Sequence, residues 1–325
     1  ARKSRGLGDV YKRQPIFSFK LRNKTMTKLS KILLSKTALL RTMSLGTILA
    51  ASSAVSAADL TITHYNPGEN AIFPASSVLV SGEKEVILFD AQFSVADGEK
   101  LVEQIKATGK ELSMIYISSG DPDFYFGLEP LVSAFPHVDV VASEAVVAHI
   151  KRTKDAKLAY WGPILDDSAP SKVIVPTVLN DTTLSLEGET IEVKEINTHQ
   201  AYLWVPSEQT VFGGVSVYSG VHVWMADTAS KEIRSQWSQS LERMKALEPE
   251  VVIPGHYLGE MPTGTNGVQF TVDYVADIEK ALVSTSNPTS IDISDHMKKA
   301  YPQFKATEGD LELGAKVLSG EMEWH

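Results

Sequence analysis

Two short apolar runs separated by a helical pattern constrain the fold of this chain more than any other feature. The first, Val86–Phe89, is followed by Asp90, and the second is Met114–Ile117. Between them, apolar side chains recur at helical spacing, and Gly109 is placed to end a helix. Apolar strands joined by a helix usually pair in parallel inside a covered sheet. Residues 86–117 are therefore predicted to form a strand, a helix and a second strand.

The second half of the chain is richer in strand patterns. Residues 183–193 alternate between apolar and polar side chains around a glycine turn, which predicts an antiparallel hairpin. Strand patterns at 202–205 and 210–212 continue this sheet, and an apolar helical stripe covers 233–247. The order suggests an α/β (α+β) fold of two mixed sheets packed together with helices outside, a four-layered αββα sandwich. Periodicity alone equally allows an ordinary α/β domain followed by an antiparallel subdomain.

The first 57 residues are expected to lie outside the folded domain. Residues 1–25 lack periodicity and resemble translated sequencing-adapter sequence, so they are interpreted as a non-native leader. Residues 26–57 combine basic side chains, a short uncharged apolar stretch and small residues before a cut after Ala57, which is typical of a secretory signal peptide. An uncleaved membrane anchor is the alternative. The remaining chain is divided into a domain over 58–265 and a C-terminal helical extension over 266–325 that packs on it.

Charge and cysteine content limit the function of the exported part. Of 31 Lys and Arg residues, 12 precede residue 58, whereas only one of 40 Asp and Glu residues does, so the rest carries a net charge of about −20. An acidic domain repels phosphate backbones, which argues against nucleic-acid binding. The chain has no cysteine, so metal ligands must be His, Asp or Glu. We expect a bacterial periplasmic or secreted protein, without stable membrane insertion after cleavage, that acts on a small molecule; the sequence indicates no oligomeric state.

A pair of carboxylates follows the second apolar strand. Asp121 and Asp123 flank Pro122 in the segment Ser118–Gly127, just before a helical pattern. Sites in α/β proteins are built where strands end at the sheet edge. Two aspartates there indicate a functional site, although aspartate is equally suited to capping the following helix.

Four segments in order resemble the metallo-β-lactamase-fold superfamily over roughly residues 60–260. They are Val86–Asp90, Ser118–Gly127, Asn197–His199 and Ile253–His256. In that family the second segment reads Thr-His-x-His-x-Asp-His-x-x-Gly, and the other segments supply further ligands. The resemblance implies the αββα fold and a site in which one or two metal ions activate an oxygen nucleophile.

The match to the family's ligand positions is incomplete. His199, Asp123 and His256 stand where the family has ligands. Four other ligand positions hold different residues, namely Ser119, Asp121, Phe124 and Val215. Three of seven expected ligands are therefore retained, and the motif is degenerate.

The resemblance still implies one candidate metal site. Asp121, Asp123, His199 and His256 would supply two oxygen and two nitrogen ligands for zinc or another divalent metal, with one ion or none bound. Asp121 and Asp123 are also the candidate catalytic residues, as ligand or base. Each of the two histidines is equally suited to a structural place at a strand end.

Five further residues are candidates for lining the same pocket. They are Ser119, Phe124, Tyr125, His222 and Asp227. Two functions then remain open. One is a hydrolase with an atypical mononuclear metal site acting on an ester, lactone or amide. The other is a non-catalytic binding or scaffold protein on the same fold that has lost its metal.

Overall fold

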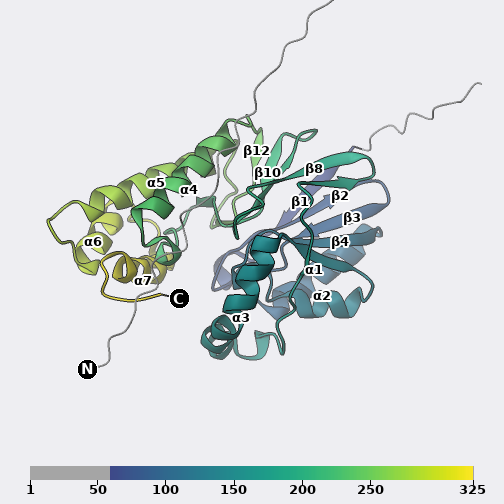
Figure 1. The fold of residues 1–325 in the computed structure, drawn as a ribbon, viewed down its shortest axis with the longest axis horizontal. Coiled ribbons are helices and arrows are strands. Elements are labelled where there is room, and N and C mark those ends of the chain that lie inside the picture. Colours follow the sequence, from purple (N-terminus) through teal and green to yellow (C-terminus); the bar gives the residue numbers. More distant parts are fainter. Residues whose placement is uncertain (1–58, 325) are drawn as a thin grey trace, which may run out of the picture. The chain divides into compact units, whose positions relative to one another are not determined.

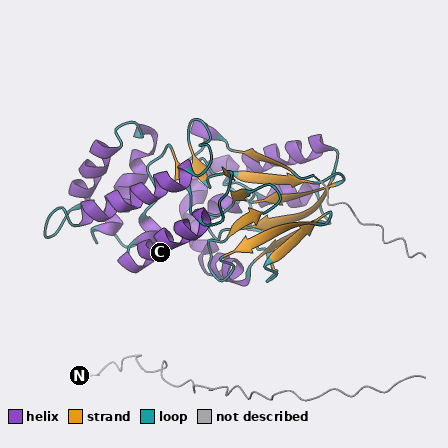
Figure 2. Cartoon of the chain, turned by 90° about the horizontal axis from the view of Figure 1, so that it is seen from above, coloured by secondary structure: helices purple, strands orange, loops and turns teal. Residues whose placement is uncertain are grey.

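Two β-sheets pack face to face between layers of helices (Figures 1 and 2). This computed structural model describes residues 59–324, so the expected leader (1–25) and signal peptide (26–57) lie outside the described residues. The architecture confirms the predicted α/β fold with two mixed sheets flanked by helices.

The first sheet is mixed and contains the predicted strand–helix–strand unit. Its strands run in spatial order β1 (Thr61–Tyr65), β2 (Ser77–Ser81), β3 (Glu85–Phe89), β4 (Glu111–Ile117), β5 (Asp139–Ala142) and β6 (Thr177–Val178). The pairs from β1 to β3 are antiparallel and those from β3 to β6 are parallel. The carboxyl ends of β3 and β4 therefore lie side by side, as a shared site requires.

The second sheet is mostly antiparallel. Its strand order is β12 (Val251–Val252), β10 (Thr210–Phe212), β9 (Tyr202–Val205), β8 (Glu189–Lys194) and β7 (Thr183–Leu186). Only β12 and β10 pair in parallel. A separate short parallel pair joins β11 (Tyr218–Ser219) to β13 (His256–Tyr257), which holds two distant segments of the second half together.

Seven α-helices and several 3₁₀ turns complete the described residues. The α-helices are α1 (Val95–Thr108), α2 (Leu128–Ala134), α3 (Glu144–Leu165), α4 (Lys231–Lys245), α5 (Asn266–Leu282), α6 (Ser290–Ala300) and α7 (Glu308–Leu318). Helix α1 begins at Ser94, whose side chain accepts from the Asp97 amide, and ends at Gly109 in the left-handed conformation, as predicted. Over residues 59–324, no helix combines the length and apolar character that a membrane crossing requires.

Separate apolar clusters fill the spaces between layers. Side chains from the inner faces of both sheets meet between them, where the Phe89 and Phe212 ring centroids lie 5.0 Å apart. Helices α1, α2 and α3 cover the outer face of the first sheet, and α4 and α5 cover the second (Figure 1). Helices α5, α6 and α7 enclose their own cluster with Val223 and Met225.

The structure differs from the predicted elements in a few places. Ile233, which the helical stripe placed in the core, is 45% exposed, while Leu241 and Met244 of the same helix are buried. The final strand pattern before His256 divides into β12 and β13, which belong to different sheets. A two-residue strand buries too few side chains to leave a periodic signal.

Gly255 allows two loops to approach closely beside β13. A Cβ atom at this position would lie 2.0 Å from the carbonyl oxygen of Gly214. No side chain fits such a gap, so glycine brings the segment before His256 against the loop after β10.

We expect G255A to lower the free energy of unfolding by roughly 1–3 kcal/mol or more, because the methyl group would force these loops apart. The control is G162A in α3, where the nearest neighbouring atom would be 3.8 Å away. That change should be neutral or stabilising by up to about 1 kcal/mol. Urea unfolding measures both, and a G255A protein as stable as the unchanged one would contradict this account.

Candidate functional site

A buried carboxylate at the end of β3 connects the strand ends that carry the site. Asp90 has a φ of 64° and is 1% exposed. It accepts hydrogen bonds from the Ser118 amide (2.8 Å) and the Ser118 hydroxyl (2.6 Å). The Ser118 hydroxyl in turn accepts from the Gly214 amide at 2.7 Å. One carboxyl group thus ties β3, β4 and the loop after β10 together, and burial raises its pKa to about 7.

The segment after β4 turns Asp121 and Asp123 toward the same region. Asp121 precedes the 3₁₀ turn η2 (Pro122–Phe124), and its carboxylate accepts from the Ser119 hydroxyl at 3.0 Å. No side chain caps η2 or α2. The capping role considered for the two aspartates is therefore not what these side chains do.

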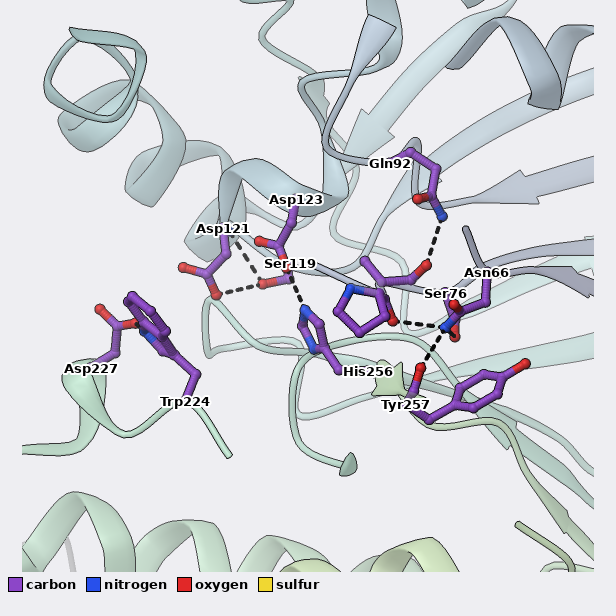
Figure 3. Close-up of polar contacts among 12 residues, drawn as sticks. Asn66, Ser76, Gln92, Ser119, Asp121, Asp123, Trp224, Asp227, His256 and Tyr257 are labelled. Atoms are coloured by element: carbon purple, nitrogen blue, oxygen red, sulfur yellow. Dashed lines mark hydrogen bonds and ion pairs between the residues drawn. The ribbon is translucent and has the colours of Figure 1, made fainter. Parts of the chain in front are cut away.

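Asp123 and His256 form a direct buried pair. The His256 Nε2 lies 2.6 Å from the Asp123 Oδ2, and the two residues are 5% and 7% exposed (Figure 3). An ionised carboxylate only accepts hydrogen bonds, so Nε2 carries the proton. The other ring nitrogen, Nδ1, is buried and has no hydrogen-bond partner. Tyr218 stacks on the imidazole at 4.9 Å and Phe124 meets it edge-on at 5.5 Å.

His199 does not lie with the other three candidate ligands. Its backbone bonds to the Gly120 amide, but its ring stacks on His149 of α3 at 4.3 Å and 7°. Burial lowers the pKa of both histidines, to about 3 for His149. Two neutral stacked rings form a packing contact, and His199 is not among the residues lining the cleft described next.

A cleft rich in carboxylates and aromatic rings lies beside the Asp123–His256 pair; we name it the acidic cleft. Its carboxylates are Asp121, Asp123, Asp227 and Asp310. Its aromatic residues are Phe73, Trp161, Tyr218, Trp224, Trp237 and Trp324. His222, His256 and Lys157 also line it. The cleft therefore draws on the strand ends of the sandwich and on the C-terminal helices.

Asp227 fixes two of the tryptophan rings. One carboxylate oxygen accepts from the Trp224 indole N–H at 2.6 Å, and the other accepts from the Trp324 indole N–H at 3.0 Å. Asp227 lies in the 3₁₀ turn η4 (Ala226–Thr228) and faces Asp121 across the cleft (Figure 3). Both indoles are thereby held with their faces available.

Two other carboxyl groups of the cleft are strongly affected by burial. Burial, reinforced by the charges of Asp227 and Asp123, raises the pKa of Asp121 to about 7. Burial likewise raises the pKa of Asp310, in the first turn of α7, to about 7. Asp310 accepts no hydrogen bond from the described residues. Oxygen acceptors therefore face the cleft without donors to match them.

The remaining candidate residues divide between the cleft and the core. His222 and Asp227 line the cleft, and the Nδ1 of His222 is hydrogen bonded to the Tyr274 hydroxyl. Ser119, Phe124 and Tyr125 are fully buried and lie behind the cleft rather than in its lining. Their alternation with Asp121 and Asp123 in the turn explains this, since neighbouring side chains point in different directions.

Several cleft residues were not identified from the sequence. Asp310 and Trp324 come from the C-terminal segment, and Phe73 precedes β2. Lys157 was recognised only as part of a helical pattern. No motif marks any of these residues, because tertiary packing alone brings them to the cleft.

A sequence model of the metallo-beta-lactamase superfamily matches residues 71–256. The chain belongs to this superfamily. The matched region begins just before β2 and ends at His256, so it contains both sheets and the Asp123–His256 pair. A search of curated proteins found no significant match.

Solved structures of the superfamily share the fold at low sequence identity. A metallo-beta-lactamase family protein from Thermus thermophilus is 16% identical, with a TM-score of 0.55 over 80% of this chain and 92% of that one. A metallo-beta-lactamase from Pontibacter korlensis is 18% identical, with a TM-score of 0.46 over 67% and 100% of the two chains. The DIM-1 metallo-beta-lactamase is 18% identical, with a TM-score of 0.46 over 66% and 92%.

Superfamily members typically bind zinc, but the residues of this chain do not fit such a site. Zinc sites use three or four His, Cys or carboxylate ligands. Within residues 59–324, no group of three or more such side chains is arranged to hold a metal ion. Asp123 and His256 bond to each other, while His199 packs on His149. The four-ligand set expected from the resemblance is therefore not assembled.

The buried carboxyl of Asp310 makes stability depend on pH. With a folded pKa of about 7 instead of 3.8, it binds more protons in the folded than in the unfolded state between these values. Its contribution to stability is thus fully present below about pH 4 and is lost as the pH rises toward 7. We expect D310N to raise the free energy of unfolding at pH 8 by on the order of 1 kcal/mol, with little change near pH 4.

The control for this prediction is D295N, which removes the same charge from an exposed position on α6. It should change the unfolding free energy by less than about 0.5 kcal/mol at either pH. Urea unfolding followed by circular dichroism at both pH values gives the comparison. A D310N protein less stable than the unchanged one at pH 8 would show that this carboxylate is stabilised rather than strained.

Proposed function

We propose that this protein is an exported member of the superfamily that binds a small molecule in the acidic cleft without a metal ion. The observation that carries the proposal is the Asp123–His256 pair, in which two residues at family ligand positions satisfy each other at 2.6 Å. A metal ion would have to break this bond. It would also lack the ligands replaced by Ser119 and Val215.

The metal-dependent hydrolysis of an ester, lactone or amide is the competing function. It needs a metal-activated water, and loss even of residues that only support metal ligands weakens binding 10–100-fold. Here the ligands themselves are replaced. The cleft nevertheless keeps concave form, aromatic walls and converging polar groups, which are the properties of a small-molecule site.

Zinc content tests this proposal. We expect protein purified without a histidine tag, then equilibrated with micromolar zinc by dialysis, to retain less than about one-tenth of an ion per chain. H256Q and D123N should give the same value as the unchanged protein, because neither side chain would be a ligand. One or two tightly held ions that are lost in H256Q would contradict the proposal and favour the metal-dependent hydrolase.

Export to the periplasm or medium is the second part of the proposal. Its support is the layout of residues 26–57, with basic side chains, an apolar stretch and small residues before Ala58. We expect N-terminal sequencing of protein produced in a bacterium from Met26 onward to begin at Ala58. A chain that keeps residues 26–57 and stays with the membrane fraction would favour the anchor instead.

A further inference from the structure

We propose that the ligand of the acidic cleft is an organic cation carrying N–H donors, a primary or secondary ammonium group attached to an apolar body. This inference rests on the proposed function and adds the chemical class of the ligand. It depends on three features of the cleft, namely its unused acceptors, its aromatic walls and its charge.

The unused polar atoms of the cleft are acceptors. His256 is 5% exposed and its Nδ1 has no partner. Because Nε2 donates to Asp123, Nδ1 of the neutral ring is left with a lone pair. The Asp310 carboxyl, whose charge interacts with His256 and Asp123, also accepts no hydrogen bond from the described residues. A ligand that satisfies these atoms must bring donors.

The indole donors of the cleft are already used. Trp224 and Trp324 both donate to Asp227, and Trp237 donates to the Ser216 carbonyl at 2.9 Å. An anionic ligand would therefore find few N–H groups to bind it, while a neutral ligand would leave the carboxylates without a counter-charge. Buried charges of this kind are costly unless they are paired.

The aromatic walls are arranged to accept a cation with an apolar body. Trp224 lies 5.6 Å from the Phe73 ring, 6.5 Å from Trp161 and 5.4 Å from Trp324, so the rings form a continuous surface. The faces of tryptophan rings attract cations within about 6 Å. The protein shows this contact internally, since the Lys157 ammonium lies 5.0 Å from the Trp324 ring.

Lys157 does not balance the charge of the cleft. It is the one lysine or arginine among the described residues that line the cleft, against four aspartates. It is 8% exposed on α3 and acts mainly on the Asp121 side, where its charge lowers the pKa of that carboxyl. The end of the cleft formed by Asp123, His256 and Asp310 lacks such a cation, and there we place the ligand ammonium.

The test compares three probes of similar shape and different charge: benzylamine, benzyl alcohol and benzoate. Four of the five tryptophans line the cleft, so intrinsic fluorescence reports its occupancy. We expect benzylamine to bind at least about tenfold more tightly than benzyl alcohol, and benzoate to bind more weakly than either. D310N should reduce benzylamine affinity by about five- to tenfold and leave benzyl alcohol unchanged, whereas D295N should alter neither.

The outcomes separate this inference from the proposed function. Equal binding of all three probes would overturn the choice of a cation and leave a metal-free binding site in place. Binding of none of them would overturn both. Selective binding of benzylamine that D310N does not weaken would also overturn the inference, because the charge recognition would then lie outside this end of the cleft.

Discussion

The hydrogen bonds from Ser118 to Asp90 and from Gly214 to Ser118 are the interaction on which the rest of the site depends. They join the ends of β3 and β4 in the first sheet to the loop after β10 in the second. Removing either partner would leave a buried polar group unpaired, which costs about 1–3 kcal/mol. The close contact of Gly255 with Gly214 extends the same join to His256. The position of the Asp123–His256 pair is thus a consequence of how the sheets are held together.

Much of the sandwich could be predicted because its strands and helices carry clear periodicity. The continuous apolar run of β3, the alternation of β7 and β8 and the cap of α1 each have a local physical cause that the sequence displays. The short pair of β11 and β13 has no such signal. Each strand has two residues, and only the tertiary fold brings Tyr218 beside His256.

The site could be predicted only in part, for the same reason. Asp121, Asp123 and His256 stand in recognisable motif positions, and the structure places all three along the acidic cleft. His199 also stands in a motif position, but its ring turns to His149, and no sequence pattern indicates which side of its loop a side chain takes. Asp310 and Trp324 come from the C-terminal segment, where amphipathic periodicity predicts helices but not which polar residue faces a cleft. A motif therefore locates a sheet edge, whereas packing decides what that edge can bind.

The central claim is that His256 is bonded to Asp123 and is not available to a metal ion. The most direct measurement is the ¹⁵N and ¹H resonances of the His256 imidazole, assigned with H256Q and recorded with and without equimolar zinc. The account predicts a protonated Nε2 in a hydrogen bond to Asp123, with resonances that zinc leaves unchanged. Loss of the Nε2 proton, with a shift of that nitrogen to the range of a metal-bound imidazole when zinc is added, would contradict it.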